Sequence, residues 1–304
     1  MKIGIPKALL YYQYGALWSD FFKELNYEVV ISGNTDSAVL QEGVSLCIDE
    51  CCVPLKVYLG HVAKLKKYCD CIFVPRYSCD GPQEEYCPRF WGLPDIVRVT
   101  FPDITVLTCN LKGYKTRHEL EGFMQLGSQL GKTPFETLKA FRKAKRAQME
   151  KTKKLQENQQ KVLNPSDIQI LLVGQPYILR DSFLGGPMVR MIKEMGASPV
   201  FSDDFDKAIC HSLSGNLSKD LYWTMNKEII GAIPLLKNKV NGIILVTAFP
   251  CGTDSLVHEL VLRRIKDIPI IHIVLDEQQG EAGLQTRLEC FIDILKETRN
   301  AYVK

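Results

Sequence analysis

The sequence has 304 residues, 46% hydrophobic and 24% charged, so the chain can bury a large core and is not intrinsically disordered. The 38 basic residues exceed the 35 acidic ones by three, a surplus too small to predict nucleic-acid binding over the whole surface. No apolar run approaches the ~20 residues of a membrane-spanning helix, and the first residues lack the features of a signal peptide. We therefore expect a soluble, cytoplasmic protein that binds neither nucleic acid nor a membrane.

Residues 1–116 are predicted to form an N-terminal α/β domain that carries most of the cysteines. Short apolar segments rich in β-branched residues are typical of buried strands, and a helical stretch from Tyr14 to Leu25 separates the first two. The predicted strands are the start of KIGIPKAL and the segments 27–32, 71–75 and 104–107. Strands that alternate with helices predict a parallel sheet covered by helices.

Residues 117–165 are predicted to form a helical connector, because apolar residues from Phe135 to Val162 approximate one face of a helix. Between Lys139 and Lys161, nine basic residues accompany two acidic ones, which gives a local charge of +7. Such a run is typical of a solvated helix face, and the alternative is a docking surface for an acidic partner.

Residues 166–304 are predicted to form a second α/β domain, whose near-continuous apolar strands fit a parallel sheet covered on both faces. The predicted strands are 168–174, 198–202, 242–247 and 269–275, and the predicted helices are 186–195, 219–237, 255–265 and 282–300. The expected fold class is therefore α/β, with two three-layer domains of the Rossmann or flavodoxin-like type joined by the helical connector.

Cysteine is the unusual residue of this sequence, since eight of the 11 fall between positions 47 and 109. Disulfide frameworks are typical of small secreted proteins, so this cluster predicts metal ligation or redox chemistry, with buried inert thiols as the alternative. The sequence contains no CxxC pair, which excludes a zinc ribbon, a bacterial-type ferredoxin and a thioredoxin-like dithiol. Any metal ligands must therefore come from separate loops.

Three cysteines lie in loops that suit ligation: Cys52 in DECCVPLK, Cys87 in EYCPRF and Cys251 in AFPCGTDS. A neighbouring Pro or Gly suits a backbone that a bulky cluster must approach. Cys251 follows a predicted strand and precedes a predicted helix, where open α/β sheets bind ligands and helix N–H groups stabilise a thiolate. For four further cysteines the sequence leaves both roles open, metal ligand or buried thiol: Cys47, Cys51, Cys79 and Cys109.

For several other candidate residues the sequence favours a structural role. The cysteines expected to be structural are Cys69, Cys71, Cys210 and Cys290, and His61 is interpreted as an ordinary helix residue. Glu50 and Lys56 flank Cys52 and are either groups supporting its ligation or a surface ion pair. Acidic residues near 276–281 either cap the last helix or line the cleft of Cys251 together with Arg287.

Motifs for nucleotide binding and hydrolysis are missing from the sequence, which contains no GxxxxGK[ST], GxGxxG, HExxH or GxSxG. We therefore do not expect the chain to hydrolyse ATP itself.

Six motifs occur in order along the chain: MKIGIPKALLYYQYGALWSDFF, DECCVPLKVYLGHV, FVPRYSC, EYCPRFWGLPD, FPCGTDSLV and DEQQGEAGLQTRLE. Together they resemble the 2-hydroxyacyl-CoA dehydratase-like family, which includes CoA-protein-activase-related and double-cubane cluster proteins. The resemblance implies two α/β domains with an iron–sulfur cluster in the cleft between them. It further implies that Cys52, Cys87 and Cys251 are the core ligands of that [4Fe-4S] or double-cubane [8Fe-9S] cluster.

The resemblance also implies a partner and a class of reaction. In such systems a separate, cluster-containing ATPase of the actin/Hsp70-like fold reduces the cluster, and the electron passes to an acyl-CoA or another small molecule. The additional cysteines that leave room for the larger cluster are Cys47, Cys51, Cys79 and Cys109. The chain looks shorter than a typical dehydratase subunit and has no clear acyl-CoA pocket pattern, so the substrate stays open.

Three hypotheses follow. The leading one is an iron–sulfur redox protein, as a monomer or a homodimer, that accepts electrons in an ATP-dependent two-component system. The second is an (R)-2-hydroxyacyl-CoA dehydratase subunit, and the third is a non-catalytic iron–sulfur binding or scaffold protein. Iron and sulfide content distinguishes the third hypothesis from the others, and turnover of a 2-hydroxyacyl-CoA distinguishes the second from the first.

Overall fold

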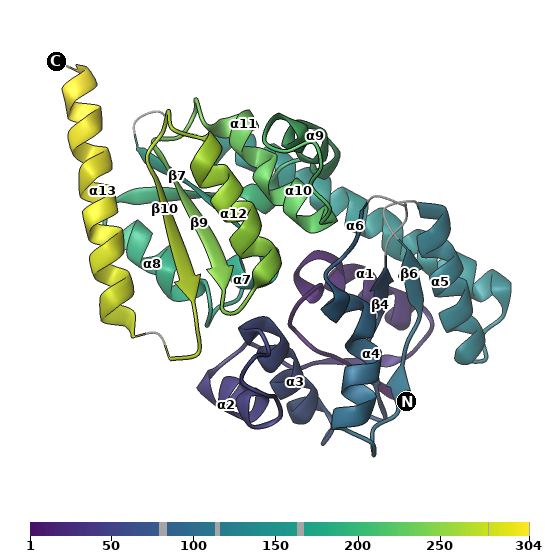
Figure 1. The fold of residues 1–304 in the computed structure, drawn as a ribbon. Helices are drawn as coiled ribbons and strands as arrows, with labels where there is room; N and C mark the ends of the chain where they lie inside the picture. Colours follow the sequence, from purple (N-terminus) through teal and green to yellow (C-terminus); the bar gives the residue numbers. More distant parts are fainter. Residues whose placement is uncertain (79–83, 113–115, 163–166, 279, 304) are drawn as a thin grey trace. The chain divides into compact units, whose positions relative to one another are not determined.

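The structure is a computed structural model that describes residues 1–304 except 79–83, 113–115, 163–166, 279 and 304 (Figure 1). The chain divides into two compact units, Met1–Lys153 and Lys154–Lys304. Each is built on a parallel sheet with helices, which confirms the predicted α/β class. The three-part division with boundaries at 116 and 165 stays a prediction. No helix within the described ranges has the length and apolar composition that a membrane crossing requires.

Unit 1 contains six short strands and six helices in the part that the structure describes. Its strands are β1 (Lys2–Ile5), β2 (Glu28–Ile31), β3 (Cys71–Phe73), β4 (Arg76–Ser78), β5 (Val106–Leu107) and β6 (Asn110–Lys112). Its helices are α1 (Tyr11–Glu24), α2 (Ser37–Ser45), α3 (Val53–Leu65), α4 (Pro88–Thr100), α5 (Thr116–Gln129) and α6 (Pro134–Val162), the last of which crosses the boundary between the units. Four strands pair in parallel in the order β2-β1-β3-β5.

The small parallel sheet of β4 and β6 continues the pairing of β3 with β5. Pro75, which has no N–H to donate, separates β3 from β4. On either side of it, the N–H groups of Val74 and Arg76 donate to the carbonyls of Leu107 and Cys109, both at 2.9 Å. The chain therefore stays paired beyond the carboxyl end of β3 on its way to α4.

Aromatic rings fill the core of unit 1 and pack α5 and the first part of α6 against it. The ring of Trp18 on α1 lies 5.5 Å from that of Phe73 on β3. Phe123 of α5 lies 4.7 Å from Phe21 on α1 and 5.1 Å from Phe141 on α6. The first part of α6 is thus packed into unit 1 by buried aromatic contacts.

Unit 2 repeats the strand order of unit 1. Its strands are β7 (Ile168–Gly174), β8 (Ala197–Phe201), β9 (Gly242–Ala248) and β10 (Ile270–Leu275), paired in parallel in the order β10-β9-β7-β8. Its helices are α7 (Pro176–Leu179), α8 (Gly186–Glu194), α9 (Lys207–Leu213), α10 (Thr224–Ile230), α11 (Ala232–Leu236), α12 (Gly252–Arg264) and α13 (Glu281–Val303). With the strands of each main sheet numbered by their order in the chain, both sheets read 2-1-3-4.

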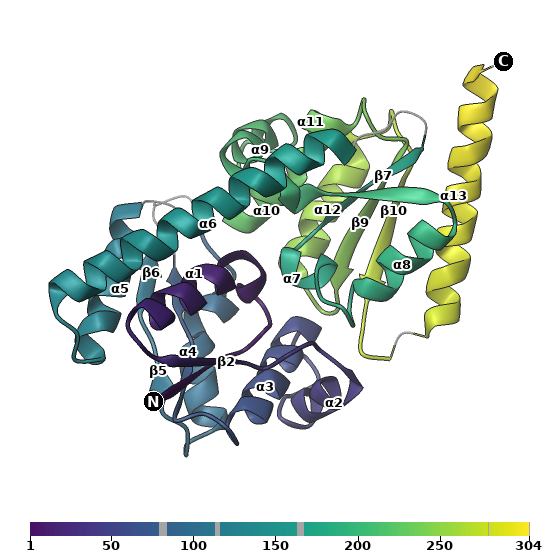
Figure 2. The same ribbon diagram turned by 180° about the vertical axis from the view of Figure 1, so that it is seen from behind.

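Helices cover both faces of the sheet in unit 2, as Figures 1 and 2 show for α12 on one face and α8 on the other. Alternate residues of β9, Ile243 and Leu245, pack with Val257 of α12. Gly242 at the start of β9 lies against Phe291 of α13, where an added Cβ would approach the ring to 2.8 Å. The fully buried β7 and β9 confirm the expectation of a covered sheet.

The segment 219–237, predicted to be helical, does not form one continuous helix. Two helices, α10 and α11, occupy 224–236 and meet at Gly231. At Gly231 an added Cβ would lie 1.7 Å from the carbonyl oxygen of Cys210 on α9. The chain must therefore pass very close to the α9 backbone at this point, which the apolar pattern of the segment did not reveal.

Candidate functional site

The segment 46–52 joins α2 to α3 and carries three of the candidate cysteines; we call it the thiol loop. Its two helices pack backbone against backbone at a pair of glycines. A Cβ added to Gly43 of α2 would lie 1.8 Å from the Lys56 carbonyl oxygen, and one added to Gly60 of α3 would lie 1.9 Å from that of Val39. Only glycine permits this separation, so the glycine pair brings together the two helices that flank the thiol loop.

Cys47 and Cys51 meet within the thiol loop. Their side chains hydrogen-bond to each other, and burial, followed by the Cys51 thiol, raises the pKa of Cys47. Residues four apart lie on one face of a helix, but α2 ends at Ser45, before both cysteines. The loop, and not a helix, therefore brings the two sulfurs together.

Cys52 and Cys87 occupy equivalent positions on two helices that contact each other. Cys52 is the N-cap of α3 and Cys87 is the N-cap of α4, each with a proline in the following first turn. Burial raises the pKa of Cys52 and the nearby Cys87 thiol raises it further, while the Leu55 N–H and Arg89 lower it. Arg89 also places Nη1 4.0 Å from Cys51 Sγ. Unit 1 thus groups two predicted core ligands with two of the additional thiols.

Lys56 lies beneath the thiol loop with only 2% of its surface exposed. Its Nζ donates to the Asp49 carbonyl oxygen at 3.3 Å, and its charge lowers the pKa of Cys47 against the effect of burial. Lys56 is therefore buried and not at the surface, where the ion-pair alternative with Glu50 placed it. A buried ammonium beside thiols instead favours a role in compensating negative charge.

Cys251, the third predicted core ligand, belongs to unit 2 and is the N-cap of α12. It follows β9 at the carboxyl end of that strand, as predicted, and its Sγ lies 3.4 Å from Thr253 Oγ1. Cys87 and Cys251 each precede the helix that follows the third strand of their sheet. At all three N-caps the positive end of a helix favours a thiolate.

A buried polar cluster, which the sequence analysis missed, supports the loop of Cys251. Asp254 in the first turn of α12 is 1% exposed, and its Oδ1 accepts hydrogen bonds from Gln175 Nε2 at 3.0 Å and Asn226 Nδ2 at 2.8 Å. Thr247 on β9 donates to its other oxygen at 3.5 Å. These bonds tie the start of α12 to the ends of β7 and β9. The available signal was an acidic residue in the first turn of a helix that follows a strand.

One turn further along α12, His258 lies fully buried with its Nδ1 3.2 Å from His272 Nε2 on β10. Burial lowers the pKa of His258 to about 4, and His272 lowers it further, against the opposing effect of Asp254. Arg287 donates to the His272 carbonyl oxygen at 2.5 Å, so it supports the backbone of β10.

The other predicted positions are distributed over core and surface. Cys71 and Cys210 are buried, as expected for structural thiols, whereas Cys290 is exposed on α13. Cys109 is also buried, and burial followed by Glu119 raises its pKa. His61 is buried in α3, with Nε2 3.0 Å from Thr35 Oγ1, consistent with an ordinary helix residue. The segment FVPRYSC ends at Cys79, which lies outside the described residues.

None of the cysteines that the structure describes is in a disulfide. Within the same part of the chain, no three His, Cys, Asp or Glu side chains surround a position for a single metal ion. The donor set of unit 1 consists of thiols alone, which fits an iron–sulfur cluster or zinc and does not fit magnesium or calcium.

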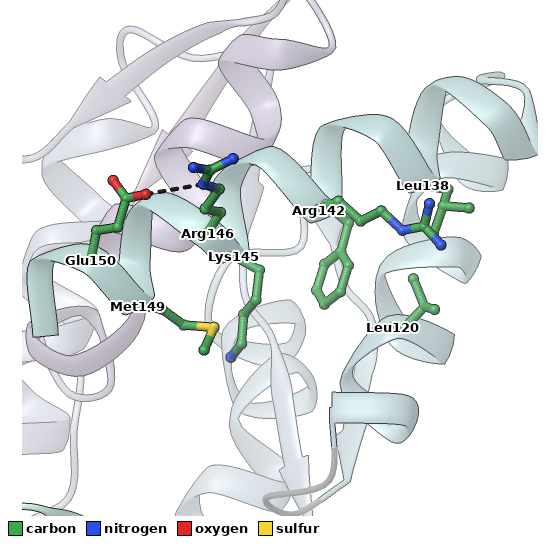
Figure 3. A pocket seen from close by; sticks show the side chains of 8 residues that line it. Leu120, Leu138, Arg142, Lys145, Arg146, Met149 and Glu150 are labelled. Atoms are coloured by element: carbon green, nitrogen blue, oxygen red, sulfur yellow. Dashed lines mark hydrogen bonds and ion pairs between the residues drawn. The ribbon is translucent and has the colours of Figure 1, made fainter. Parts of the chain in front are cut away.

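The basic stretch on α6 is partly neutralised within unit 1. Lys143 pairs with Glu24 of α1 at 2.6 Å, and Lys145 pairs with Glu119 of α5 at 2.6 Å. Arg146 pairs with Glu150 on α6 itself at 3.0 Å, as Figure 3 shows. The predicted +7 therefore overstates the free positive charge of this helix. Side chains from 155 to 161 lie outside the described residues.

A groove between α5 and α6 has a cavity of about 450 Å³ (Figure 3). Its apolar lining comes from Leu120 on α5 and from Leu138, Phe141 and Met149 on α6. Arg142 lines the same groove and, like Met149, is exposed. The docking alternative for α6 thus retains an apolar surface beside an exposed cation.

The family model described as "CoA enzyme activase uncharacterised domain (DUF2229)" matches residues 2–205. The chain belongs to this family. The region of the CoA enzyme activase uncharacterised domain includes the thiol loop and Cys87, whereas Cys251 lies beyond its end. Among curated proteins, none matches the sequence.

Similar solved structures include the SBP FpvC from Pseudomonas aeruginosa in complex with Mn2+, at a TM-score of 0.29 and 13% identity over 98% of this chain and 99% of that one. ZnuA is similar at a TM-score of 0.28 and 9% identity, over 97% of this chain and 98% of that one. Glucosamine-6-phosphate deaminase from Thermotoga maritima is similar at a TM-score of 0.23 and 8% identity, over 98% of this chain and 86% of that one. Similarity at this level assigns no ligand or activity to the chain.

Proposed function

We propose that this member of the CoA enzyme activase uncharacterised domain family binds an iron–sulfur cluster and accepts electrons in an ATP-dependent two-component system for low-potential one-electron reduction. The observation that carries the proposal is the grouping of four cysteine thiols in unit 1. Cys52 and Cys87 are the N-caps of two contacting helices, and Cys47 and Cys51 lie beside them. Such thiol-only sites bind iron–sulfur clusters or zinc, and the resemblance to dehydratase-like and double-cubane proteins favours the cluster.

The residues of unit 1 suit a group that carries negative charge. Ligation requires thiolates, but burial raises the pKa of Cys47 and Cys52 and thus holds their protons. The Leu55 N–H in the first turn of α3 opposes this effect at Cys52, and the positive ends of the α3 and α4 dipoles act in the same direction. When bound, an iron–sulfur cluster supplies one-electron storage at low potential. The chain's own contribution is to hold the thiolates and to orient them from two rigid helices.

We assign Cys251 as the third core ligand within the same proposal. Its N-cap position before α12 corresponds to that of Cys87 before α4, because each helix follows the third strand of its sheet. The buried cluster around Asp254 holds the first turn of α12 and limits the movement of the Cys251 loop.

The proposed partner is a cluster-containing ATPase of the actin/Hsp70-like fold. The family name relates the chain to CoA enzyme activases, and the sequence has no ATP-binding motif of its own. A partner that delivers electrons must dock on the surface of this chain, and the exposed cations of α6 are our candidate contact.

Anaerobic reconstitution with iron and sulfide tests the proposal. The wild-type protein should become brown, with broad visible absorption and stoichiometric iron and sulfide, and dithionite reduction should produce an EPR signal. Cys52→Ser and Cys87→Ser should lose most of the iron, whereas Cys290→Ser, on the exposed face of α13, should retain it. A colourless wild-type protein that takes up one zinc instead would contradict the proposal.

A further inference from the structure

We infer that Lys56 and Arg89 are fixed positive charges that raise the reduction potential of the cluster bound near Cys52 and Cys87. The inference rests on the proposed function and assigns a role to two side chains that neither the family match nor the thiol pattern identifies. Both residues are positioning residues, since they act through their charge and do not ligate iron.

The burial of Lys56 is the first observation. A charged ammonium with 2% of its surface exposed has lost most of its hydration, which costs free energy unless negative groups compensate it. Its Nζ reaches the thiol loop, where it donates to the Asp49 carbonyl at 3.3 Å and interacts with the Cys47 thiol. A group of thiolates at this loop would place negative charge close to this ammonium.

Arg89 provides an independent observation from the other helix. It lies in the first turn of α4, two residues after the N-cap Cys87, and extends to within 4.0 Å of Cys51 Sγ. Its charge also acts on the Cys52 thiol. Two cations, one from α3 and one from α4, therefore approach the same group of sulfurs.

The electrostatic consequence has a definite sign. Reduction adds an electron to a cluster that already carries the negative charge of its thiolates. A nearby cation therefore stabilises the reduced form more than the oxidised form and raises the potential. A buried charge is screened less by salt than an exposed one. Lys56 should have the larger effect, and half-buried Arg89 should have a smaller effect that decreases as the ionic strength rises.

An EPR-monitored redox titration of reconstituted full-length protein tests this inference. Lys56→Met removes the charge and keeps the side-chain length, and Arg89→Gln removes the second charge. Lys67→Met, at an exposed position in the turn that follows α3, is the matched control. We expect a more negative midpoint potential for Lys56→Met at low and high salt, a smaller negative shift for Arg89→Gln, and no shift for Lys67→Met.

The possible outcomes separate this inference from the proposed function. A wild-type protein that binds no iron would overturn both. Full iron content with wild-type midpoint potentials in Lys56→Met and Arg89→Gln would overturn the inference alone. If Lys56→Met does not fold, Arg89→Gln decides: a negative shift that shrinks at high salt supports the inference, and an unchanged potential refutes it.

Discussion

Replacement of Gly60 by Ala should destabilise unit 1 because it forces α2 and α3 apart. The new Cβ would lie 1.9 Å from the Val39 carbonyl oxygen, whereas a close carbon–oxygen contact is about 3.3 Å. The two backbones would have to separate by more than about 1 Å, since neither side of the contact is a flexible side chain. Overpacking of this kind costs about 1–3 kcal/mol or more, and the better helix propensity of Ala returns up to about 1 kcal/mol. We expect a net loss of about 2 kcal/mol.

Gly92 of α4 provides the matched control. A Cβ added there has Ile96 Cδ1 at 4.0 Å as its nearest neighbour, so Gly92→Ala should be neutral or stabilise by up to about 1 kcal/mol. Urea unfolding at pH 7, followed through tryptophan fluorescence to which buried Trp18 of the same unit contributes, measures both variants by linear extrapolation. Equal stability of the Gly60→Ala and Gly92→Ala proteins would refute the reasoning. Gly60→Ala should also take up less iron per folded molecule, because α3 positions Cys52.

Three further predictions concern unit 2 and α6. Burial holds the pKa of His258 at about 4, so below about pH 6.5 the unfolded chain takes up a proton that the folded chain excludes. The unfolding free energy of unit 2 should therefore fall by about 2 kcal/mol from pH 7 to pH 5, as measured by urea unfolding, and His258→Gln should show a shallower dependence. Cys251→Ser should reduce the iron content after reconstitution, and full iron would remove it from the ligand set. Reversal of exposed Arg142 and Lys151 to Glu should slow ATP-dependent cluster reduction by the partner at low salt and less at high salt. Lys143 is kept unchanged because it belongs to an ion pair of unit 1. Wild-type rates at both salt concentrations would move the docking site elsewhere.

The sheets could be predicted from the sequence because burial leaves a local signature. β7 and β9 are buried at every position, and a run such as IQILLVG indicates this directly. β5 lies within the predicted strand 104–107, whereas the extension formed by β4 and β6 has no comparable signature. Their pairing depends on backbone hydrogen bonds that bypass Pro75, and these involve partners more than 30 residues away.

The candidate site was predictable only in its local parts. Motifs with a cysteine beside Pro or Gly indicated Cys52, Cys87 and Cys251, and the structure places all three at helix N-caps. The burial of Lys56 and the hydrogen bonds of Asp254 were not predictable. The Asp254 partner Gln175 is 79 residues away, and no local pattern specifies which distant side chains meet.

The two units have the same strand order but differ in the residues that surround their cysteines. In each, a cysteine precedes the helix after the third strand, Cys87 in unit 1 and Cys251 in unit 2. Unit 1 adds the thiol loop and two cations, Lys56 and Arg89, to this arrangement. Unit 2 instead places the buried carboxylate of Asp254 and its amide donors behind the cysteine. A carboxylate cannot favour added negative charge, so within the proposed function we assign control of the potential to unit 1 and the rigid positioning of one further thiolate to unit 2.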